Sequence, residues 1–419
     1  MFRRAILLIA AMLVFPAAAQ ADVLSNTGDG IYAAMTAQAG GTFRATWVEG
    51  NTVRESVDLG PARDVIRLTA RDRFPFGAAD AHGGVVVAFQ RKGPPYRRVY
   101  FAIRREDGKL TPARKLSPAG HTAEVPAIAG DAAGNALACW RRYDGSVWQA
   151  QCAIRKAGAN EFGPAVTLPG GADRDRFAPQ PAVGANGRLA VVYETQTRVL
   201  AAVGSVEGGL AGGLPIGTHS LNYANASVAV AGDGSAMVVW TTVDGQHHDI
   251  QAVRLAPDGT PSPPQQVGAP GGVQPAELAP PALAALSDGS FLGAWASGKD
   301  MLAAAATAAT ATAPAAAGFG APTRVGAVED FSWPARIAAG PGATATLAWT
   351  LEAPIGHPST VQLARFANAT WSAPATISPA NGRALAPFPA VNFSGTSAVA
   401  WIDSREGGAM GNVDAMIVR

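Results

Sequence analysis

Several charged residues stand in short clusters between predicted strands, where they could bind an anionic ligand. Two clusters share the pattern Arg-Asp-Arg, and others carry acidic residues with a tryptophan, or a lone arginine. The candidate ligand-binding residues are Arg71, Asp72, Arg73, Arg174, Asp175, Arg176, Glu329, Asp330, Trp333 and Arg383. A guanidinium group donates two parallel hydrogen bonds to one carboxylate or sulfate, so arginines on a concave rim favour such ligands. Alternatively, each Arg-Asp pair holds only its own loop together.

No familiar catalytic motif occurs in the sequence. G-x-S-x-G, H-E-x-x-H, the P-loop, C-x-x-C and the EF-hand loop are all absent. His247 and His248 are adjacent and precede Asp249, but neighbouring residues of a strand point to opposite faces and would not share a metal ion. We therefore expect no metal and no cofactor, and the catalytic residues of any enzymatic activity remain unknown.

The two cysteines, Cys139 and Cys152, flank a predicted turn at Gly145 and Ser146. A hairpin at this turn places them opposite each other. Directly opposed residues of antiparallel strands have Cα atoms about 4.5–5.5 Å apart, which is within the range of a disulfide. We predict a structural disulfide, with two unlinked buried thiols as the alternative.

The first 21 residues read as a cleaved export signal. Arg3 and Arg4 precede an apolar run from Ala5 to Phe15, and Ala19–Ala21 forms a small-x-small cleavage site. We therefore divide the chain into a signal peptide, residues 1–21, and one domain, residues 22–419. The predicted location is outside the cytoplasm: periplasmic, secreted or at the cell surface.

The charge balance limits the classes of partner. Two of the 33 basic residues lie in the signal, which leaves 31 basic and 31 acidic residues and a formal net charge of zero for the rest of the chain. Nucleic-acid and anionic-membrane binders need a basic excess, so we expect neither partner, and no later stretch is long enough to span a membrane. We expect a monomer that binds an extracellular glycan or protein. The charges are uneven: residues 63–115 hold 13 basic and 5 acidic residues, whereas the chain beyond residue 200 holds 8 and 14.

The elements that must position these residues are β-strands. The 48 glycines and 31 prolines are spread along the whole chain and separate many short apolar runs. No amphipathic helical pattern lasts more than a turn or two. This organisation is typical of an all-β sandwich, barrel or propeller.

An internal repeat distinguishes among these folds. An aromatic residue ends a short apolar run at intervals of 42 to 55 residues, at Trp47, Phe89, Trp140, Tyr193, Trp240, Trp295, Trp349 and Trp401. Six residues before each aromatic stands a glycine, except for Ala343, and eleven residues before it stands an alanine, except for Thr36. The glycine marks a tight turn, the alanine lies on a first strand near the central axis, and the aromatic lies on the second strand, between neighbouring sheets.

Each repeat predicts a four-stranded antiparallel sheet that must stack on its neighbours. We therefore predict one all-β propeller of about eight blades, with seven as the alternative. The last copy has only three strands, and Asp22–Asn26 is the candidate for its fourth, which would close the ring. The Ala/Thr-rich tract from Met301 to Gly318 is interpreted as a third strand and its turn rather than a helix.

The repeat resembles secreted bacterial propellers of the sialidase-like, BNR type. Asp233 and Gly234 before Trp240, followed by Asp244-Gly245 and Asp249–Ala252, carry the resemblance. The Asp-box of that family has its glycine three residues before the tryptophan, whereas here the glycine stands six before it, so the box is not matched. The resemblance implies the fold only.

Two functions follow as hypotheses. The first is a binding or scaffolding module for a carbohydrate or protein, acting through the loops at one end of the propeller. The alternative is a glycoside hydrolase or lyase of sialidase-like type with acidic residues at the channel mouth, where paired carboxylates lie about 5–5.5 Å or 6.5–9.5 Å apart. A purely structural role in the cell envelope predicts no ligand at all.

Overall fold

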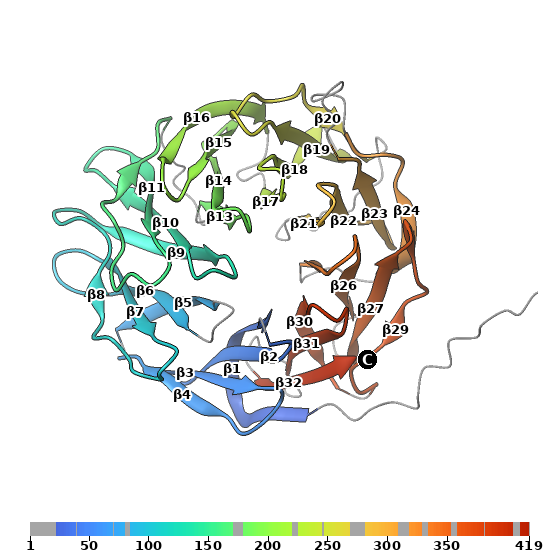
Figure 1. Cartoon of the computed structure of the whole chain (residues 1–419), viewed down its shortest axis with the longest axis horizontal. Helices are drawn as coiled ribbons and strands as arrows, with labels where there is room; N and C mark the ends of the chain where they lie inside the picture. The colour runs from blue at the N-terminus through green and yellow to red at the C-terminus, as the bar shows by residue number, and fades with distance from the viewer. Residues whose placement is uncertain are drawn as a thin grey trace, which may run out of the picture.

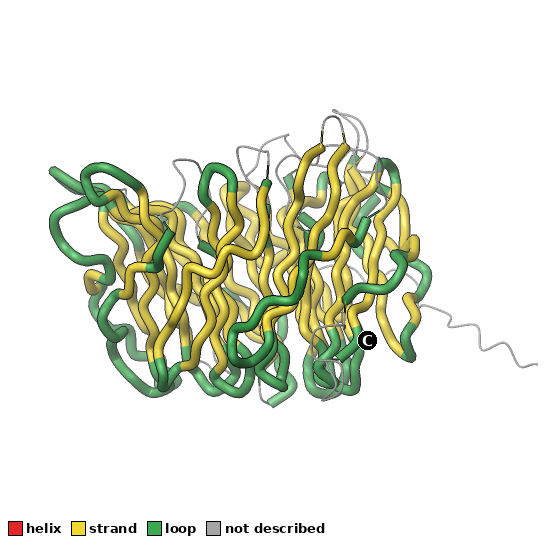
Figure 2. The backbone as a smooth tube through the Cα atoms, turned by 90° about the horizontal axis from the view of Figure 1, so that it is seen from above, coloured by secondary structure: helices red, strands yellow, loops and turns green. Residues whose placement is uncertain are grey.

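The computed structural model describes residues 22–38, 40–69, 71–79, 84–170, 179–219, 225–244, 247–268, 281–308, 318–328, 334–352, 358–380, 382–404 and 411–418. Within these residues the regular structure is entirely β, and no helix occurs. Small antiparallel sheets stand radially around a central axis (Figure 1). Seen from the side, their strands run between two faces formed by loops (Figure 2).

The strands form eight four-stranded blades, and the predicted propeller is confirmed. Blades 1 to 4 consist of β1 (Asp22–Ala37), β2 (Phe43–Glu49), β3 (Thr52–Val57), β4 (Arg63–Arg67); β5 (Asp72–Ala79), β6 (Val85–Arg91), β7 (Arg98–Arg104), β8 (Arg114–Lys115); β9 (Ala123–Gly130), β10 (Ala136–Tyr143), β11 (Trp148–Arg155), β12 (Val166–Thr167); β13 (Gln180–Val183), β14 (Arg188–Glu194), β15 (Arg198–Ser205) and β16 (Gly209–Thr218).

Blades 5 to 8 repeat the arrangement. They consist of β17 (Ser227–Val230), β18 (Ala236–Asp244), β19 (His247–Leu255), β20 (Gln265–Gln266); β21 (Ala282–Ala285), β22 (Phe291–Ser297), β23 (Asp300–Ala306), β24 (Thr323–Ala327); β25 (Arg336–Ala339), β26 (Ala345–Glu352), β27 (Ser359–Ala367), β28 (Thr370–Trp371) with β29 (Ala375–Thr376); and β30 (Ala384–Val391), β31 (Ser397–Asp403) and β32 (Gly411–Val418). The Ala/Thr-rich tract begins in strand β23, as predicted; residues 309–317 lie outside the described part of the chain.

Strand β1 closes the ring. Its first residues pair with β32, with Asp22 opposite Ala415, and its last residues pair with β2, with Thr36 opposite Arg44. One long strand is therefore the fourth strand of blade 8 and the first strand of blade 1 (Figure 1). The predicted closure by Asp22–Asn26 is confirmed, and the ring has no open edge at this junction.

The repeated aromatics form the core between blades. All eight lie on the second strand of a blade, and each is at most 5% exposed. Glycines on the outer strand of the preceding blade make room for some of them. A Cβ at Gly217 would lie 2.3 Å from Trp240 Cζ2, and one at Gly326 would lie 2.5 Å from Trp349 Cζ2. The blades thus stack by inserting an indole ring against bare backbone.

The repeated glycines that lie in the described part of the chain occupy turns with positive φ, as predicted; Gly83 lies outside it. Gly41, Gly134 and Gly395 have φ of 84°, 94° and 80°. Ala343 takes the same left-handed conformation, with φ of 55°, although an L-residue is disfavoured there. The backbone geometry of this turn is therefore preserved even where the glycine is replaced.

The predicted disulfide is present. Cys139 on β10 lies opposite Cys152 on β11, with Cα atoms 4.0 Å apart, and a disulfide joins the two side chains. Both residues are fully buried and pack between blades 3 and 4 against Leu189 and Val191. The bond therefore links two adjacent strands within a core cluster.

Candidate functional site

The candidate site is a pocket of about 760 Å³ between blades 2 and 3. It opens on the face that carries the connections between blades and the hairpins between second and third strands, which we call the loop face. The pocket is lined by Arg71, Lys92, Gly93, Pro94, Pro95, Arg97, Thr122, Glu124, Tyr143 and Trp148. This is the face where the sequence predicts ligand binding.

Backbone hydrogen bonds hold the walls of the pocket together. The walls are residues 92–97 between β6 and β7, residues 116–122 between β8 and β9, and the hairpin between β10 and β11. Ala123 N donates to Arg97 O at 2.9 Å, and Tyr143 N donates to Thr122 O at 2.8 Å. The three segments are therefore fixed relative to one another although each is a loop.

Glu124 is the electrostatic centre of the pocket wall. Its side chain is 7% exposed and accepts hydrogen bonds from Arg97 Nη1 at 2.6 Å and Arg141 Nη2 at 2.7 Å. The Arg141 guanidinium also lies over the ring of Trp148, 4.8 Å from its centre. Both carboxylate oxygens are thus used in positioning cations, and Arg141 in turn orients the indole.

A strained backbone turns Glu124 toward these arginines. The register of β9 against β10 shifts here, and the next residue, Val125, has φ of 51°. Positive φ is rare for a β-branched residue and marks a constrained position. The side-chain oxygen of Gln90 accepts the Val125 N–H at 3.1 Å. The bulge therefore has a specific partner that fixes it.

Three exposed cations line the pocket. Lys92 N donates to Arg71 O at 2.8 Å, so these two residues are neighbours, and both are exposed. The structure shows no ion pair between either side chain and another described residue. The Arg97 side chain is 51% exposed and keeps part of its guanidinium free for a ligand. These cations can bind an anionic group.

Flat apolar groups also line the pocket. The rings of Tyr143 and Trp148 lie 5.4 Å apart, and Pro94 and Pro95 complete the surface. Tyr143 is 36% exposed. Aromatic rings with one open face pack well against the C–H groups of a sugar or of another planar ligand.

The hairpin that carries these rings is held by Asp144. Its Oδ1 accepts hydrogen bonds from Val147 N and Ser146 N, both at 2.8 Å. These backbone donors, with the nearby His121, lower the pKa of Asp144 to about 2. Asp144 is therefore ionised at any physiological pH and serves the turn rather than proton transfer.

The structure shows where part of the sequence-based candidate set lies. Arg71 lines the pocket, but Asp72 holds its own loop: it accepts hydrogen bonds from Thr69 N at 2.8 Å and Arg91 Nε at 2.7 Å. Burial acts to raise the pKa of Asp72, but the hydrogen bonds from Arg91 and Thr69 outweigh it and lower the pKa. The loop-holding alternative thus describes Asp72, although its ion-pair partner is Arg91.

The other candidates are not brought to this pocket by the described structure. Arg383 lies where blade 7 joins blade 8, and its N–H donates to Asp403 Oδ1 at 3.2 Å. Outside the described residues lie Arg174, Asp175, Arg176, Glu329, Asp330 and Trp333. The side chains of Arg73, His247 and His248 are also outside the described part.

Sequence reasoning missed most of the pocket: Lys92, Arg97, Glu124, Tyr143 and Trp148. The available signal was the position of the hairpins, because the repeat places residues 91–98 and 143–148 on the loop face. Aromatics that flank a predicted hairpin turn on that face could have been added to the candidate set.

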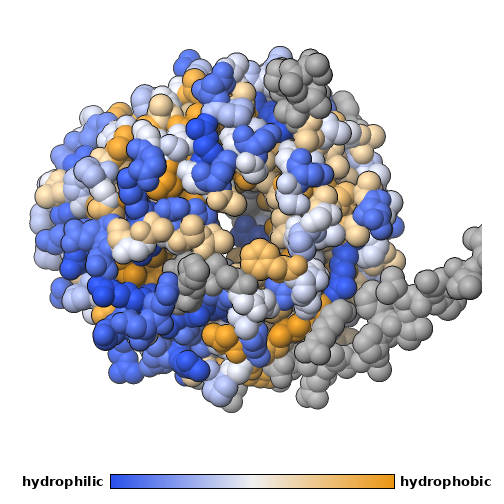
Figure 3. Space-filling model, in the orientation of Figure 1, coloured by the Kyte–Doolittle hydropathy of each residue, from blue (hydrophilic) through white to orange (hydrophobic). Residues whose placement is uncertain are grey.

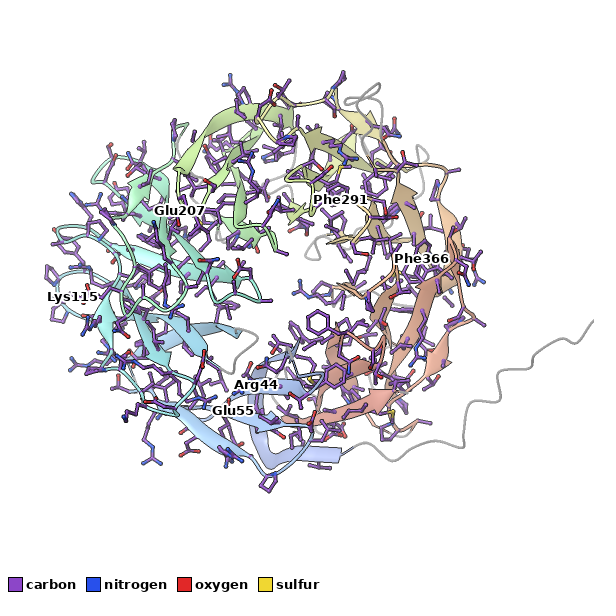
Figure 4. The ribbon with its side chains drawn as sticks, in the orientation of Figure 1. Arg44, Glu55, Lys115, Glu207, Phe291 and Phe366 are labelled. Carbon is purple, nitrogen blue, oxygen red and sulfur yellow. A yellow bond between two sulfur atoms is a disulfide. The ribbon has the colours of Figure 1, made fainter. Side chains whose placement is uncertain are left out.

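A second charged cluster lies away from the pocket, between blades 1 and 2. Glu55 is 2% exposed and accepts hydrogen bonds from Arg44 of its own blade and Arg104 of the next. Figure 4 shows Arg44 and Glu55 side by side on blade 1. Burial lowers the pKa of Arg104, partly offset by Glu55. The cluster is buried and joins two blades.

Hydrophilic residues are unevenly distributed over the surface (Figure 3). On the face shown in Figure 3, hydrophilic residues gather over the blades that contain β1–β8, beside a central hollow. No helix in the described residues has the length and apolarity needed to cross a membrane.

No known family and no curated protein match this chain. Solved structures resemble it in fold. They include virginiamycin B lyase from Staphylococcus aureus, with 10% identity over 95% of this chain and 99% of that chain and a TM-score of 0.46. NanB sialidase from Streptococcus pneumoniae has 7% identity over 90% of this chain and 83% of that chain and a TM-score of 0.43. Prolyl oligopeptidase B from Galerina marginata has 11% identity over 91% of this chain and 56% of that chain and a TM-score of 0.48. The resemblance to sialidases and other propellers concerns the fold alone.

Proposed function

We propose that this chain is an exported binding module whose loop-face pocket recognises an anionic carbohydrate. One observation carries the proposal: three cations, Arg71, Lys92 and Arg97, and two aromatic rings line the same open pocket. The volume of about 760 Å³ is within the usual range for small-molecule sites, about 300–1,000 Å³. A sugar ring would pack on Tyr143 and Trp148 while its carboxylate or sulfate binds the cations.

The arrangement of acidic groups favours binding over hydrolysis at this pocket. Among its described lining residues, Glu124 is the only carboxylate. Its two oxygens accept hydrogen bonds from Arg97 and Arg141, so it is poorly suited to donate or remove a proton. Glycoside hydrolysis normally requires a pair of carboxyl groups on either side of the scissile bond.

Export is part of the proposal. Residues 1–21 have the pattern of a signal peptide, and the disulfide between Cys139 and Cys152 is of the kind that persists in oxidising compartments. We propose that residues 22–419 form the single mature domain, which carries the pocket to the cell exterior or periplasm.

The experiment compares the mature protein with two variants. Glycan arrays and fluorogenic glycosides measure binding and turnover for the wild type, for Arg71→Ala/Lys92→Ala, and for Lys299→Ala, an exposed loop-face cation of blade 6. We expect acidic glycans to be bound without turnover, the double variant to lose at least about 10-fold in affinity, and Lys299→Ala to match the wild type. Turnover of any glycoside, or no binding to any glycan, contradicts the proposal.

A further inference from the structure

We infer that the pocket receives one end of a polyanionic polysaccharide whose chain leads outward over blades 2 and 1. This inference rests on the proposed function and adds the length and direction of the ligand. It follows from a row of cations, Arg97, Lys92, Arg71 and Arg67, which we call the cationic rim. The rim extends beyond the pocket, because Arg67 is not among the residues that line it.

Strand pairing and loop hydrogen bonds place the rim. Arg67 is the last residue of β4, the outer strand of blade 1, and pairs with Thr52 beside the loop-face hairpin of that blade. The next residue is held to the same hairpin, since Leu68 N donates to Asn51 O at 2.6 Å. The chain then leads inward to Arg71, whose carbonyl accepts Lys92 N–H. The rim thus runs from the outer edge of the propeller to the pocket.

Apart from Arg97, which pairs with Glu124, the charge of the rim is weakly compensated. The Arg67 side chain is 80% exposed and its nearest carboxylate, Asp64, is 3.7 Å away and itself 53% exposed. Exposed pairs of this kind contribute little and are easily exchanged for another anion. The buried acids nearby are already occupied, Asp72 by Arg91 and Glu124 by Arg97 and Arg141. A repeating anion can therefore bind the rim without displacing a strong internal pair.

A polysaccharide fits the rim better than a single-stranded nucleic acid. Binding of a nucleic-acid strand normally uses successive aromatic platforms along the whole groove. Here the aromatic residues of the site are Tyr143 and Trp148, which line the pocket, and the exposed Tyr96 beside Arg97, so all three lie at the pocket end of the rim. One sugar on the aromatic wall and further acidic units on the cations match this distribution.

The test uses oligogalacturonates of one to eight units and heparin oligosaccharides of matched length, which separate carboxylate from sulfate recognition. Calorimetry at several salt concentrations measures affinity for the mature wild type, Arg67→Ala and Lys299→Ala. We expect affinity to rise at least about 10-fold from one unit to eight. The slope of the logarithm of the affinity against the logarithm of the salt concentration should become steeper by about one for each added ionic contact. We expect Arg67→Ala to weaken the long oligomers about 3- to 10-fold and to leave the monomer unchanged, with Lys299→Ala as wild type.

Two outcomes overturn the inference while the proposed function survives: equal affinity for monomer and octamer, or wild-type affinity of Arg67→Ala for the octamer. Tighter binding of single-stranded DNA of equal charge than of either polysaccharide overturns the ligand class. Failure to bind any acidic glycan, monomer included, contradicts the proposed function itself. Because Arg67 is exposed, its variant is expected to fold normally, and a thermal unfolding curve confirms this before binding is measured.

Discussion

Arg141 Nη2 donates a hydrogen bond to Glu124 Oε1 at 2.7 Å, and both side chains are at most 10% exposed. Because the same guanidinium lies over Trp148 and the same carboxylate holds Arg97, this pair connects the cationic and the aromatic sides of the pocket. The pair therefore determines the shape of the site without needing to touch a ligand.

Replacing Glu124 should destabilise the fold much more than replacing its exposed partner. Glu124→Ala removes the buried carboxylate that pairs with the buried Arg141, so we expect the free energy of unfolding to fall by about 3 kcal/mol. Arg97→Ala removes a half-exposed cation and should cost under about 1 kcal/mol. Urea denaturation of both variants measures the difference. Equal losses would show that Glu124 does not hold Arg141 as described.

The ring closure can be tested with two adjacent residues of β1. Leu24 is 9% exposed and packs in the core between blades 8 and 1, whereas Val23 is 52% exposed. We expect Leu24→Ala to lower the free energy of unfolding by about 2–3 kcal/mol, because it removes buried methyl groups. Val23→Ala, on the opposite face of the same strand, should change it by less than about 0.5 kcal/mol. Similar values for both variants would contradict the closure by β1.

The fold was predictable because its signals recur. Trp140 and Trp240 mark the same position in different blades, and the repetition outweighs the ambiguity of any single short strand. The disulfide followed from one local turn: once Cys139 and Cys152 lie on the two arms of a hairpin, their pairing depends only on register.

The site was predictable only where it is local. Arg71, which lines the pocket, was among the predicted candidates because the repeat sets its loop position. Glu124 was missed because its role depends on partners 27 and 17 residues away, Arg97 and Arg141, and on the bulge at Val125. No single segment of the sequence carries that information.

Stability in acid should report on Asp72. Its pKa is lowered in the folded protein, so it stabilises the fold above its unfolded pKa of about 4, and this contribution is lost as pH falls through the lowered pKa. We expect the free energy of unfolding of Asp72→Asn to be about 2 kcal/mol below that of the wild type at pH 7. This difference in free energy should become smaller toward pH 2. Arg91→Gln removes the main group that lowers this pKa. In this variant the stabilising contribution of Asp72 should therefore be lost at a higher pH than in the wild type. Unfolding curves between pH 2 and 7 measure both effects, and a gap that does not narrow in acid would contradict the assignment.

The turn at Ala343 is the one described copy of the repeat where an L-residue stands in place of the positive-φ glycine. The left-handed conformation costs a residue with a Cβ about 1–2 kcal/mol, while glycine adds about 0.5–1 kcal/mol of backbone entropy to the unfolded chain. We therefore expect Ala343→Gly to raise the free energy of unfolding by up to about 1 kcal/mol.

The reciprocal change in blade 3, Gly134→Ala, should lower the free energy of unfolding by a similar amount, because Gly134 has φ of 94°. Calorimetric melting of the two variants measures both shifts under the same conditions. The two changes in the free energy of unfolding must have opposite signs, since both residues occupy the same position of the repeated turn. A loss of stability in Ala343→Gly would mean that the packing of the alanine methyl group contributes more than the backbone strain costs.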